Sequence, residues 1–265
     1  MTTTVRSAAG SDIGCRRSGN QDSAYTSPRL LAVADGMGGH AHGEVASSLA
    51  IRAVADADAR LDGVDLHAVD LLDTLRDAVD DAAQRLSGAA DADPSLRGTG
   101  TTLVALLLDG TRVGVAHVGD SRAYLLRDGE LTQLTHDHTL VQSLVDEGRI
   151  TAHEAADHPR RSVLVRTLQE GTPAEPDLFG VEGRPGDRFL VCSDGVTAVL
   201  ADDELADVLV DVGEPADVVD RIIELARDGG GPDNITCVVA DLVEGDPAGA
   251  GGMLFGAAAE TATGS

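Results

Sequence analysis

A run of apolar residues that ends in an aspartate and several glycines constrains this chain more than any other stretch. Leu30 to Val33 predict a buried strand, and Asp35 follows where the strand stops, with glycines at 36, 38 and 39. Glycine permits close backbone approaches, so Asp35 and the carbonyl of Gly36 can both face one small, hard cation. The stretch Leu30–His40 thus indicates a metal site. An Asp-Gly pair after a strand is more often an ordinary turn, so this interpretation depends on whether the pattern recurs.

The pattern does recur, in distant parts of the chain. Aspartates stand at strand ends or in glycine-rich turns next to strands at Asp22, Asp35, Asp120, Asp194 and Asp233. Strand ends gather at a common edge of a compact sheet, so these carboxylates can converge although no short motif joins them. Gathering so many negative charges is costly unless cations neutralise them. Oxygen ligands without Cys or paired His favour Mg²⁺ or Mn²⁺ over zinc or copper.

A pair of such cations suits the hydrolysis of phosphate esters, because together they lower the pKa of a bridging water and hold an electrophile in line with it. A phosphate also needs a positive group. Arg17, in the same polar segment as Asp22, can grip two phosphate oxygens with its planar guanidinium, and Arg16 is the rival candidate. None of the three cysteines lies in a HCx₅R context, which argues against the cysteine-based phosphatases.

Apolar spacing and turn residues outline the secondary structure. Helices are expected over 41–60, 66–86, 140–147, 152–156, 202–212 and 215–228. Strands are expected over 101–108, 112–118, 122–127, 130–134, 188–193 and 235–242. The Asp-Gly pairs at 109–110 and 128–129 predict that the first four of these strands form an antiparallel meander. We interpret residues 135–170, which have weaker core character, as a mobile flap over one face of the molecule.

Composition limits the domain count, the partners and the compartment. With 265 residues, 42% of them hydrophobic, the chain can form one domain over 1–243, followed by a disordered tail over 244–265 that is rich in Gly, Ala, Thr and Ser. A net charge of −25 argues against binding to nucleic acid or to an anionic membrane. Isolated cysteines, no apolar leader and no apolar stretch of the roughly 20 residues that cross a bilayer predict a cytoplasmic protein.

The motifs together resemble those of the metal-dependent Ser/Thr protein phosphatases of the PP2C type, in their short bacterial form. The resemblance extends from Ser11 to about Leu242 in the family's order, through SDIGCRRSGNQD, VADGMGGHAHGEVAS, GTGTT, AHVGDSRAYLLRDGELTQLTHDH, HPRRSVLVRTL, LVCSDGVTAVL and GGGPDNIT. It implies an α+β fold of four layers, α-β-β-α, in which two central antiparallel sheets lie between pairs of helices.

The resemblance also implies a role for each site residue. Asp35 would bridge two cations, Mn²⁺ or Mg²⁺, and the Gly36 carbonyl would contact one of them. Asp194 and Asp233 would complete the other site, and Asp22 would ligate it or orient its water. Asp120, in the GDSR motif, corresponds to the aspartate that holds a third, weaker metal in bacterial members. The spacing of the N-terminal motif places Arg17, not Arg16, at the position that binds substrate phosphate.

Departures from the family pattern concern the metal contacts and the acid that protonates the leaving group. Position 21 is Gln where many members have Glu, so a water-mediated role is expected there. Position 37 is Met where many eukaryotic members have a His suspected of being this acid, which leaves His40 and His158 as candidates, with metal-bound water as the alternative proton source.

The implied activity is hydrolysis of phosphoserine and phosphothreonine by direct attack of metal-activated water. The expected substrates are proteins modified by bacterial Ser/Thr kinases, with the kinases themselves among them. Two alternatives remain at this point. One is an inactive regulatory or binding module with the same fold, against which the presence of Asp35, Asp194 and Asp233 argues. The other is a phosphatase that acts on an anti-sigma-factor antagonist in a partner-switching circuit.

Overall fold

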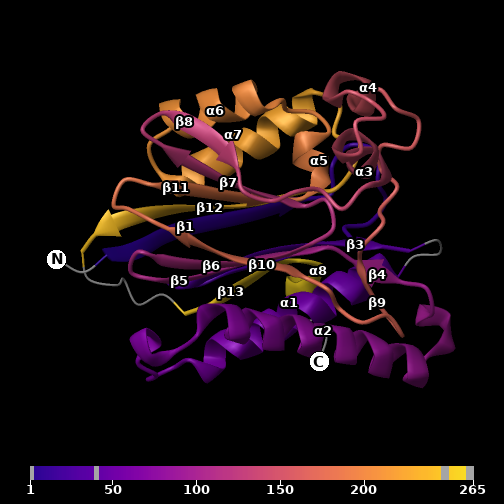
Figure 1. Ribbon diagram of the computed structural model, residues 1–265, viewed down its shortest axis with the longest axis horizontal. Helices are drawn as coiled ribbons and strands as arrows, with labels where there is room; N and C mark the ends of the chain where they lie inside the picture. The colour runs from indigo at the N-terminus through magenta and orange to yellow at the C-terminus, as the bar shows by residue number, and fades with distance from the viewer. Residues whose placement is uncertain (1–2, 39–41, 246–250, 261–265) are drawn as a thin grey trace.

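Two stacked antiparallel sheets with helices on both outer faces make up the computed structural model, which describes residues 3–38, 42–245 and 251–260 (Figure 1). The five-stranded sheet has the order β1 (Thr3–Asp12), β12 (Ile235–Glu244), β11 (Arg188–Cys192), β7 (Arg122–Arg127), β8 (Glu130–Gln133). The eight-stranded sheet has the order β10 (Asp177–Glu182), β6 (Arg112–Val118), β5 (Leu103–Asp109), β3 (Leu30–Met37), β2 (Asp22–Thr26), β13 (Met253–Gly256), with the short β4 (Gly100–Thr101) and β9 (Leu168–Gln169) at its side.

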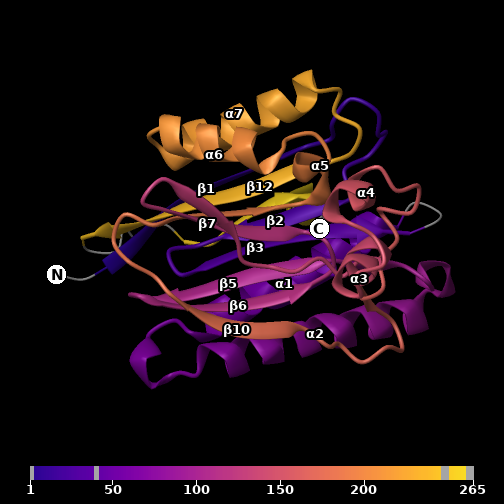
Figure 2. The ribbon, with the colours of Figure 1, turned by 45° about the horizontal axis from the view of Figure 1, so that its top comes forward.

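The outer layers are a pair of long helices on each sheet. Helices α1 (Gly43–Arg60) and α2 (Leu71–Ala92) cover the eight-stranded sheet, and α6 (Asp202–Asp211) and α7 (Pro215–Asp228) cover the five-stranded one (Figures 1 and 2). Short helical segments complete the list: η1 (Leu66–Ala68), η2 (Pro94–Leu96), α3 (Leu140–Asp146), α4 (Ala152–Ala156), α5 (Asp194–Thr197) and α8 (Ala257–Glu260). The predicted α+β fold with four layers is confirmed.

Each helix pair forms because its sequence offers an apolar face and defined ends. In α2, Leu71, Leu75 and Val79 repeat at helical spacing and are buried against the sheet, while the Asp70 side chain accepts hydrogen bonds from the backbone N–H groups at the start of the helix. Helix α7 begins with Pro215, a residue suited to the first helical turn, and buries Val218 and Ile222. A separate cluster of apolar side chains, which includes Leu31, Val104 and Phe189, fills the space between the two sheets.

The predicted meander over residues 101–134 is wrong in one respect, because its two hairpins belong to different sheets. Strands β5 and β6 pair in the eight-stranded sheet, whereas β7 and β8 pair in the five-stranded sheet. The link between β6 and β7 crosses from one sheet to the other at Gly119. Its φ of 109° is a backbone angle that glycine adopts readily and other residues rarely do. Local turn chemistry predicts each hairpin but does not specify which sheet it joins.

Strands β1 and β10 were not predicted from the sequence. Strand β1 pairs with β12 along its whole length, but most of its residues are only partly buried and its second half reads SAAGSD. Strand β10 pairs with β6 and exposes most of its side chains in part. Both are edge strands, each paired through its backbone to one neighbour. Because their side chains are only partly buried, their sequences lack the apolar alternation on which prediction depends.

The expectation of disorder over 244–265 is wrong for residues 253–260. Strand β13 pairs with β2 in register, from Met253 opposite Thr26 to Gly256 opposite Ser23. Helix α8 then buries Ala257 and Ala258 against α1, and the Arg52 guanidinium donates to the Ala258 carbonyl at 3.0 Å. A composition rich in Gly and Ala suggested disorder, but Leu254 and Phe255 of β13 pack against the apolar core, and the small alanines of α8 are buried. Residues 246–250 and 261–265 lie outside the described part of the chain.

The segment 135–170, which we call the flap, contains the two short helices that were predicted for it. Helix α3 is capped by Thr139, and α4 has a capping box formed by Thr151 and Glu154. The flap lies at the end of the sheets where β3 and β4 are seen (Figure 1). Its expected mobility stays a prediction.

Candidate active site

The five aspartates singled out in the sequence gather at one end of the two sheets. Asp22 opens β2 and Asp35 lies near the end of β3, so both come from the eight-stranded sheet. The five-stranded sheet contributes one aspartate that follows β11 and one that precedes β12, Asp194 and Asp233. Asp120 lies on the link that crosses between the sheets. Electrostatic interactions join Asp35 to all four of the others.

Strand alternation turns two of these carboxylates toward the opposite sheet. Asp22 and Asp35 are register partners on neighbouring strands. Val33, two residues before Asp35, belongs to the cluster between the sheets, so Asp35 shares that face. Asp22 is 1% exposed, and its Oδ2 accepts a hydrogen bond of 2.7 Å from Ser193 Oγ of the other sheet. The centre is therefore built from both sheets at once.

Burial and mutual repulsion raise the pKa values of these carboxyl groups. The pKa of Asp22 rises to about 7, chiefly because of burial, with further increases from Asp194 and Asp233. The pKa of Asp35 rises well above its usual range because of burial and the charge of Asp22. The pKa values of Asp120, to about 7, and of Asp194 also rise, again chiefly through burial. A set of buried and half-buried carboxylate oxygens that repel one another fits hard divalent cations.

Arg17 brings a positive charge to the aspartates. Its Nη2 donates to Asp233 Oδ2 at 2.6 Å, and this hydrogen bond, together with the charges of Asp35 and Asp194, raises the pKa of the guanidinium. The Arg17 side chain remains 51% exposed, so the guanidinium lies at the border between the aspartates and solvent. Arg16 is exposed, and its Nη2 lies near Gly230.

Gly36 lies where no side chain fits. A Cβ at this position would come within 2.0 Å of the Gly43 carbonyl oxygen and 2.7 Å of that of Gln21. The backbone of β3 therefore approaches the start of α1 closely beside Asp35. The Gln21 side chain is turned to α1, where its Nε2 donates to Glu44 Oε2 at 3.3 Å.

Of the two candidate proton donors, His158 lies in the described part of the chain, and it is not gathered at the aspartates. His158 lies in a pocket of about 370 Å³ within the flap, beside Leu140 and Arg149, and its Nδ1 accepts from the backbone N–H of Arg160. Met37, in the last position of β3, pairs with Gly100. His40 lies outside the described residues.

Sequence reasoning missed the polar residues that hold the centre together. The Asn234 side chain donates to the carbonyls of Ile13 and Gly19 and accepts from the Gln21 N–H, which fixes the loop that carries Arg17. Thr102 donates its N–H to the Asp35 carbonyl at 2.9 Å, and its Oγ1 accepts from the Asp35 N–H. Asn234 follows Asp233 directly and Thr102 ends the GTGTT motif, so their place in conspicuous motifs was the available signal.

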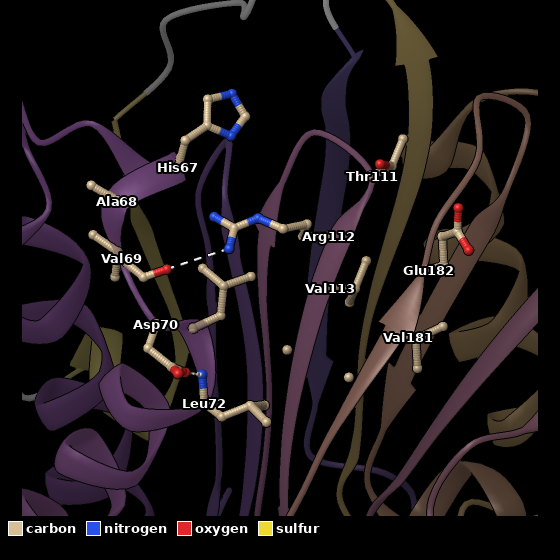
Figure 3. A pocket seen from close by; sticks show the side chains of 13 residues that line it. His67, Ala68, Val69, Asp70, Leu72, Thr111, Arg112, Val113, Val181 and Glu182 are labelled. Atoms are coloured by element: carbon tan, nitrogen blue, oxygen red, sulfur yellow. Dashed lines mark hydrogen bonds between the residues drawn. The ribbon is translucent and has the colours of Figure 1, made fainter.

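A pocket of about 490 Å³ opens beside Asp120 and Asp194. Its other walls come from the flap, with Val141, Ala155 and Arg161, and from the region of α5 and α6. A larger hollow of about 670 Å³ lies elsewhere, between the start of α2 and strands β6 and β10 (Figure 3). Strand β6 begins in that hollow at Arg112 and ends two residues before Asp120, so the larger hollow is at the far end of the strand from the aspartates.

Comparison with known proteins places this arrangement in a family. The family model described as protein phosphatase 2C matches residues 9–228. The chain belongs to the protein phosphatase 2C family. The resemblance seen in the sequence motifs is thus confirmed. Arg17 and four of the five aspartates lie within the matched range, and Asp233 follows five residues after its end.

Named members of the protein phosphatase 2C family are close in sequence. The serine/threonine protein phosphatase PstP of Mycobacterium tuberculosis is 51% identical over 246 residues, which is 93% of this chain and 46% of PstP. The chain therefore spans about half the length of that relative. The serine/threonine phosphatase stp of Listeria welshimeri is 38% identical over 212 residues, 80% of this chain and 84% of its own length.

Solved structures of family members share the fold. The crystal structure of M. tuberculosis PstP superposes with a TM-score of 0.86 and 51% identity, over 91% of this chain and all of that one. A structure of the PstP catalytic domain in complex with two manganese ions gives a TM-score of 0.83 at 49% identity, over 92% of this chain and all of that one.

Proposed function

We propose that this chain is a protein serine/threonine phosphatase that depends on divalent cations. The observation that carries the proposal is the gathering of five aspartates and Arg17 at one end of the two stacked sheets. The names of the relatives, which are serine/threonine phosphatases, support the same activity. The inactive-module alternative has no support, because the aspartates are present and lie together. The comparisons do not point to a partner-switching phosphatase either.

The aspartates are proposed to hold Mn²⁺ or Mg²⁺. Asp35, which interacts with all the others, would bridge two cations, and the Gly36 carbonyl would face one of them. Asp194 and Asp233 would complete the second position, and Asp120 would hold a third, weaker cation. The PstP structure with two manganese ions supports this assignment. When bound, such a pair supplies a water of lowered pKa for attack on phosphorus.

The chain's own residues then bind and orient the substrate. Arg17 is proposed to exchange its hydrogen bond with Asp233 for non-bridging phosphate oxygens, which its exposed guanidinium can contact from the solvent side. Asp22, held by Ser193 and buried between the sheets, is proposed to orient a water at the centre.

The proposed substrates are phosphorylated proteins. The pocket of about 490 Å³ beside Asp120 and Asp194 offers space for residues that flank a phosphoserine or phosphothreonine, and the flap forms one of its walls. We include bacterial Ser/Thr kinases and their targets among these substrates.

The proposed place of action is the cytoplasm. The three cysteines are free thiols, and two of them are buried, which fits a reducing compartment. Among the helices in the described ranges, none is long and apolar enough to span a bilayer.

The test is release of phosphate from a phosphothreonine peptide, with Mn²⁺ and with chelator. The wild type should turn over only with Mn²⁺, and Asp194→Asn should lose at least about a hundredfold in rate, because a ligand of the cation pair is gone. The control is Asp207→Asn, which removes a carboxylate on the exposed face of α6 and should keep the wild-type rate. A folded wild type that binds Mn²⁺ but releases no phosphate would overturn the proposal.

A further inference from the structure

A polar cluster beside the aspartate centre has no part in the function proposed so far. It consists of His117 on β6, His138 at the start of the flap, Arg166 near the end of the flap and Asp177 on β10. The ligand atoms of the two histidines and Asp177 lie within 4.8 Å of one another. His117 is fully buried, and neither of its ring nitrogens has a hydrogen-bond partner among the described residues.

The hydrogen bonds of His138 argue against a metal site in this cluster. Its Nδ1 accepts the backbone N–H of Gly119 at 3.0 Å, so the ring proton must be on Nε2. That nitrogen lies 3.1 Å from Asp177 Oδ2, to which it donates. A cation would have to displace this proton beside the Arg166 guanidinium, which already binds Asp177 Oδ1 at 2.6 Å. The cluster is therefore a set of hydrogen bonds centred on His138.

His138 forms hydrogen bonds with both the backbone N–H and the carbonyl of Gly119. Besides the bond at Nδ1, the backbone N–H of His138 donates to the Gly119 carbonyl at 2.8 Å. A side chain at position 119 would come within 2.5 Å of Thr102, so the backbone is also confined on that side. The residue that follows Gly119 is Asp120. Fixing the Gly119 peptide groups fixes where the Asp120 carboxylate can go.

A second contact strengthens the same connection. Arg122, two residues after Asp120, forms a two-pronged ion pair with Asp137 at 2.9 and 2.7 Å. The residues before and after Asp120 thus contact two consecutive residues of the flap: Gly119 contacts His138, and Arg122 contacts Asp137. The neutral His117 ring, whose pKa burial lowers to about 4, packs on His138 with ring centroids 4.5 Å apart.

On its other side, His138 contacts the end of the flap and strand β10. Its carbonyl accepts from the Val165 N–H at 2.9 Å, and its ring Nε2 donates to Asp177, whose carboxylate also accepts from Arg166. The geometry points to His138 as a positioning residue, which sets Asp120 through Gly119 for the third cation and links that cation site to the flap. The inference rests on the proposed function only in taking Asp120 as a cation ligand.

Two substitutions of similar size separate the two contacts of His138. In His138→Asn, the amide oxygen can take the place of Nδ1 and keep the bond from Gly119. In His138→Gln, the amide reaches toward Asp177 instead, and the acceptor for Gly119 is lost. The quantity measured is Mn²⁺ binding, by calorimetry and by the electron paramagnetic resonance signal of free Mn²⁺. The variant Asp120→Ala identifies the weakest binding step, which is the one assigned to the third cation. These measurements do not depend on phosphatase activity, so failure of the proposed function would be seen separately in the peptide assay.

His138→Gln is expected to weaken the weak Mn²⁺ step about tenfold, as loss of a supporting contact does at other metal sites, and His138→Asn by less than about threefold. The tight steps should change by less than about twofold in both variants. The control is His136→Ala, which removes an exposed ion pair with Asp146 on the same segment and should leave every step unchanged. Equal weakening of all steps by His138→Gln, an unchanged weak step, or the reverse order of Asn and Gln would overturn the inference. Thermal unfolding of each variant shows that it is folded.

Discussion

Asp22 and Asp35 stand directly opposite each other on neighbouring strands, with both carboxylates between the sheets. Like charges in this arrangement destabilise a sheet, and their burial adds to the cost. In the cation-free protein, these two carboxylates therefore repel each other at the site of the proposed chemistry.

Asp35→Asn should stabilise the cation-free protein and abolish its response to Mn²⁺. The amide keeps the shape of the side chain but removes the charge that interacts with the other four aspartates. We expect the free energy of unfolding without cations to increase by roughly 1 kcal/mol. The wild type should gain stability with Mn²⁺ concentration, because the ion binds only the folded state, and the variant should gain little. Urea unfolding with and without Mn²⁺ measures both effects. A variant that is less stable than the wild type in chelator would contradict this prediction.

Arg17→Lys should weaken the use of substrate although the charge is kept. Lysine cannot offer the planar pair of donors that grips two phosphate oxygens. We expect KM for a phosphothreonine peptide to rise about tenfold, which corresponds to the roughly 1.5 kcal/mol of one hydrogen bond to a charged group. Steady-state kinetics at saturating Mn²⁺ measure it. Arg16→Lys is the matched control next in sequence and should behave as the wild type, and equal effects of the two changes would argue against the assignment of Arg17.

His117→Leu should reduce the amount of stability that the protein loses between about pH 6.5 and pH 4. Burial lowers the pKa of His117 to about 4 in the folded protein, against about 6.5 in the unfolded chain. Between these values the unfolded chain binds a proton that the folded protein does not, so stability falls as the pH falls from about 6.5 to about 4. Leucine removes this contribution, which amounts to about 2 kcal/mol at pH 5.

The measurement is the difference in unfolding free energy between His117→Leu and the wild type at pH 7 and at pH 5. At pH 7 the variant should be at least as stable as the wild type, because leucine leaves no unpartnered ring nitrogens. Its advantage should grow at pH 5. His153→Leu changes an exposed histidine of α4 and should follow the wild-type profile. Parallel pH profiles for His117→Leu and the wild type would show that this ring does not titrate as inferred.

Removal of residues 253–265 should destabilise the protein and make it prone to association. The truncation takes away β13, the partly buried Leu254 and Phe255, and the two buried alanines of α8. We expect a loss of roughly 2–4 kcal/mol from the apolar surface that is exposed. The edge of β2 would also lose its partner, and an unpaired edge invites pairing with another chain. Urea unfolding and light scattering test these effects, with truncation after Glu260 as the control. Wild-type stability in the longer truncation would mean that the docked segment contributes nothing.

The sequence was sufficient to locate the aspartates because each stands in a local pattern, such as Asp35 after the apolar run of β3. The layered fold could be predicted through the family resemblance and the helix pairs. The assignment of β5–β6 and β7–β8 to different sheets could not, since a hairpin pattern contains only the two strands that it joins.

Long-range contacts account for the rest of what was missed. His138 contacts Gly119 across 19 positions, and Asn234 reaches the N-terminal loop across more than 200. Side chains of this kind satisfy backbone groups whose position depends on the completed fold. Strand β13 was missed for a related reason, since its order depends on β2 and not on its own composition.

The proposed ligands are divided between the sheets, with Asp22 and Asp35 on one and Asp194 and Asp233 on the other. Neither sheet alone carries enough of them to hold a cation pair. During folding, the site can therefore appear only when the sheets have stacked, and capture of cations should coincide with the last cooperative step. A chain that has formed its helices and only one sheet would not bind Mn²⁺ at this site. Binding of the ion would therefore report that both sheets are in place.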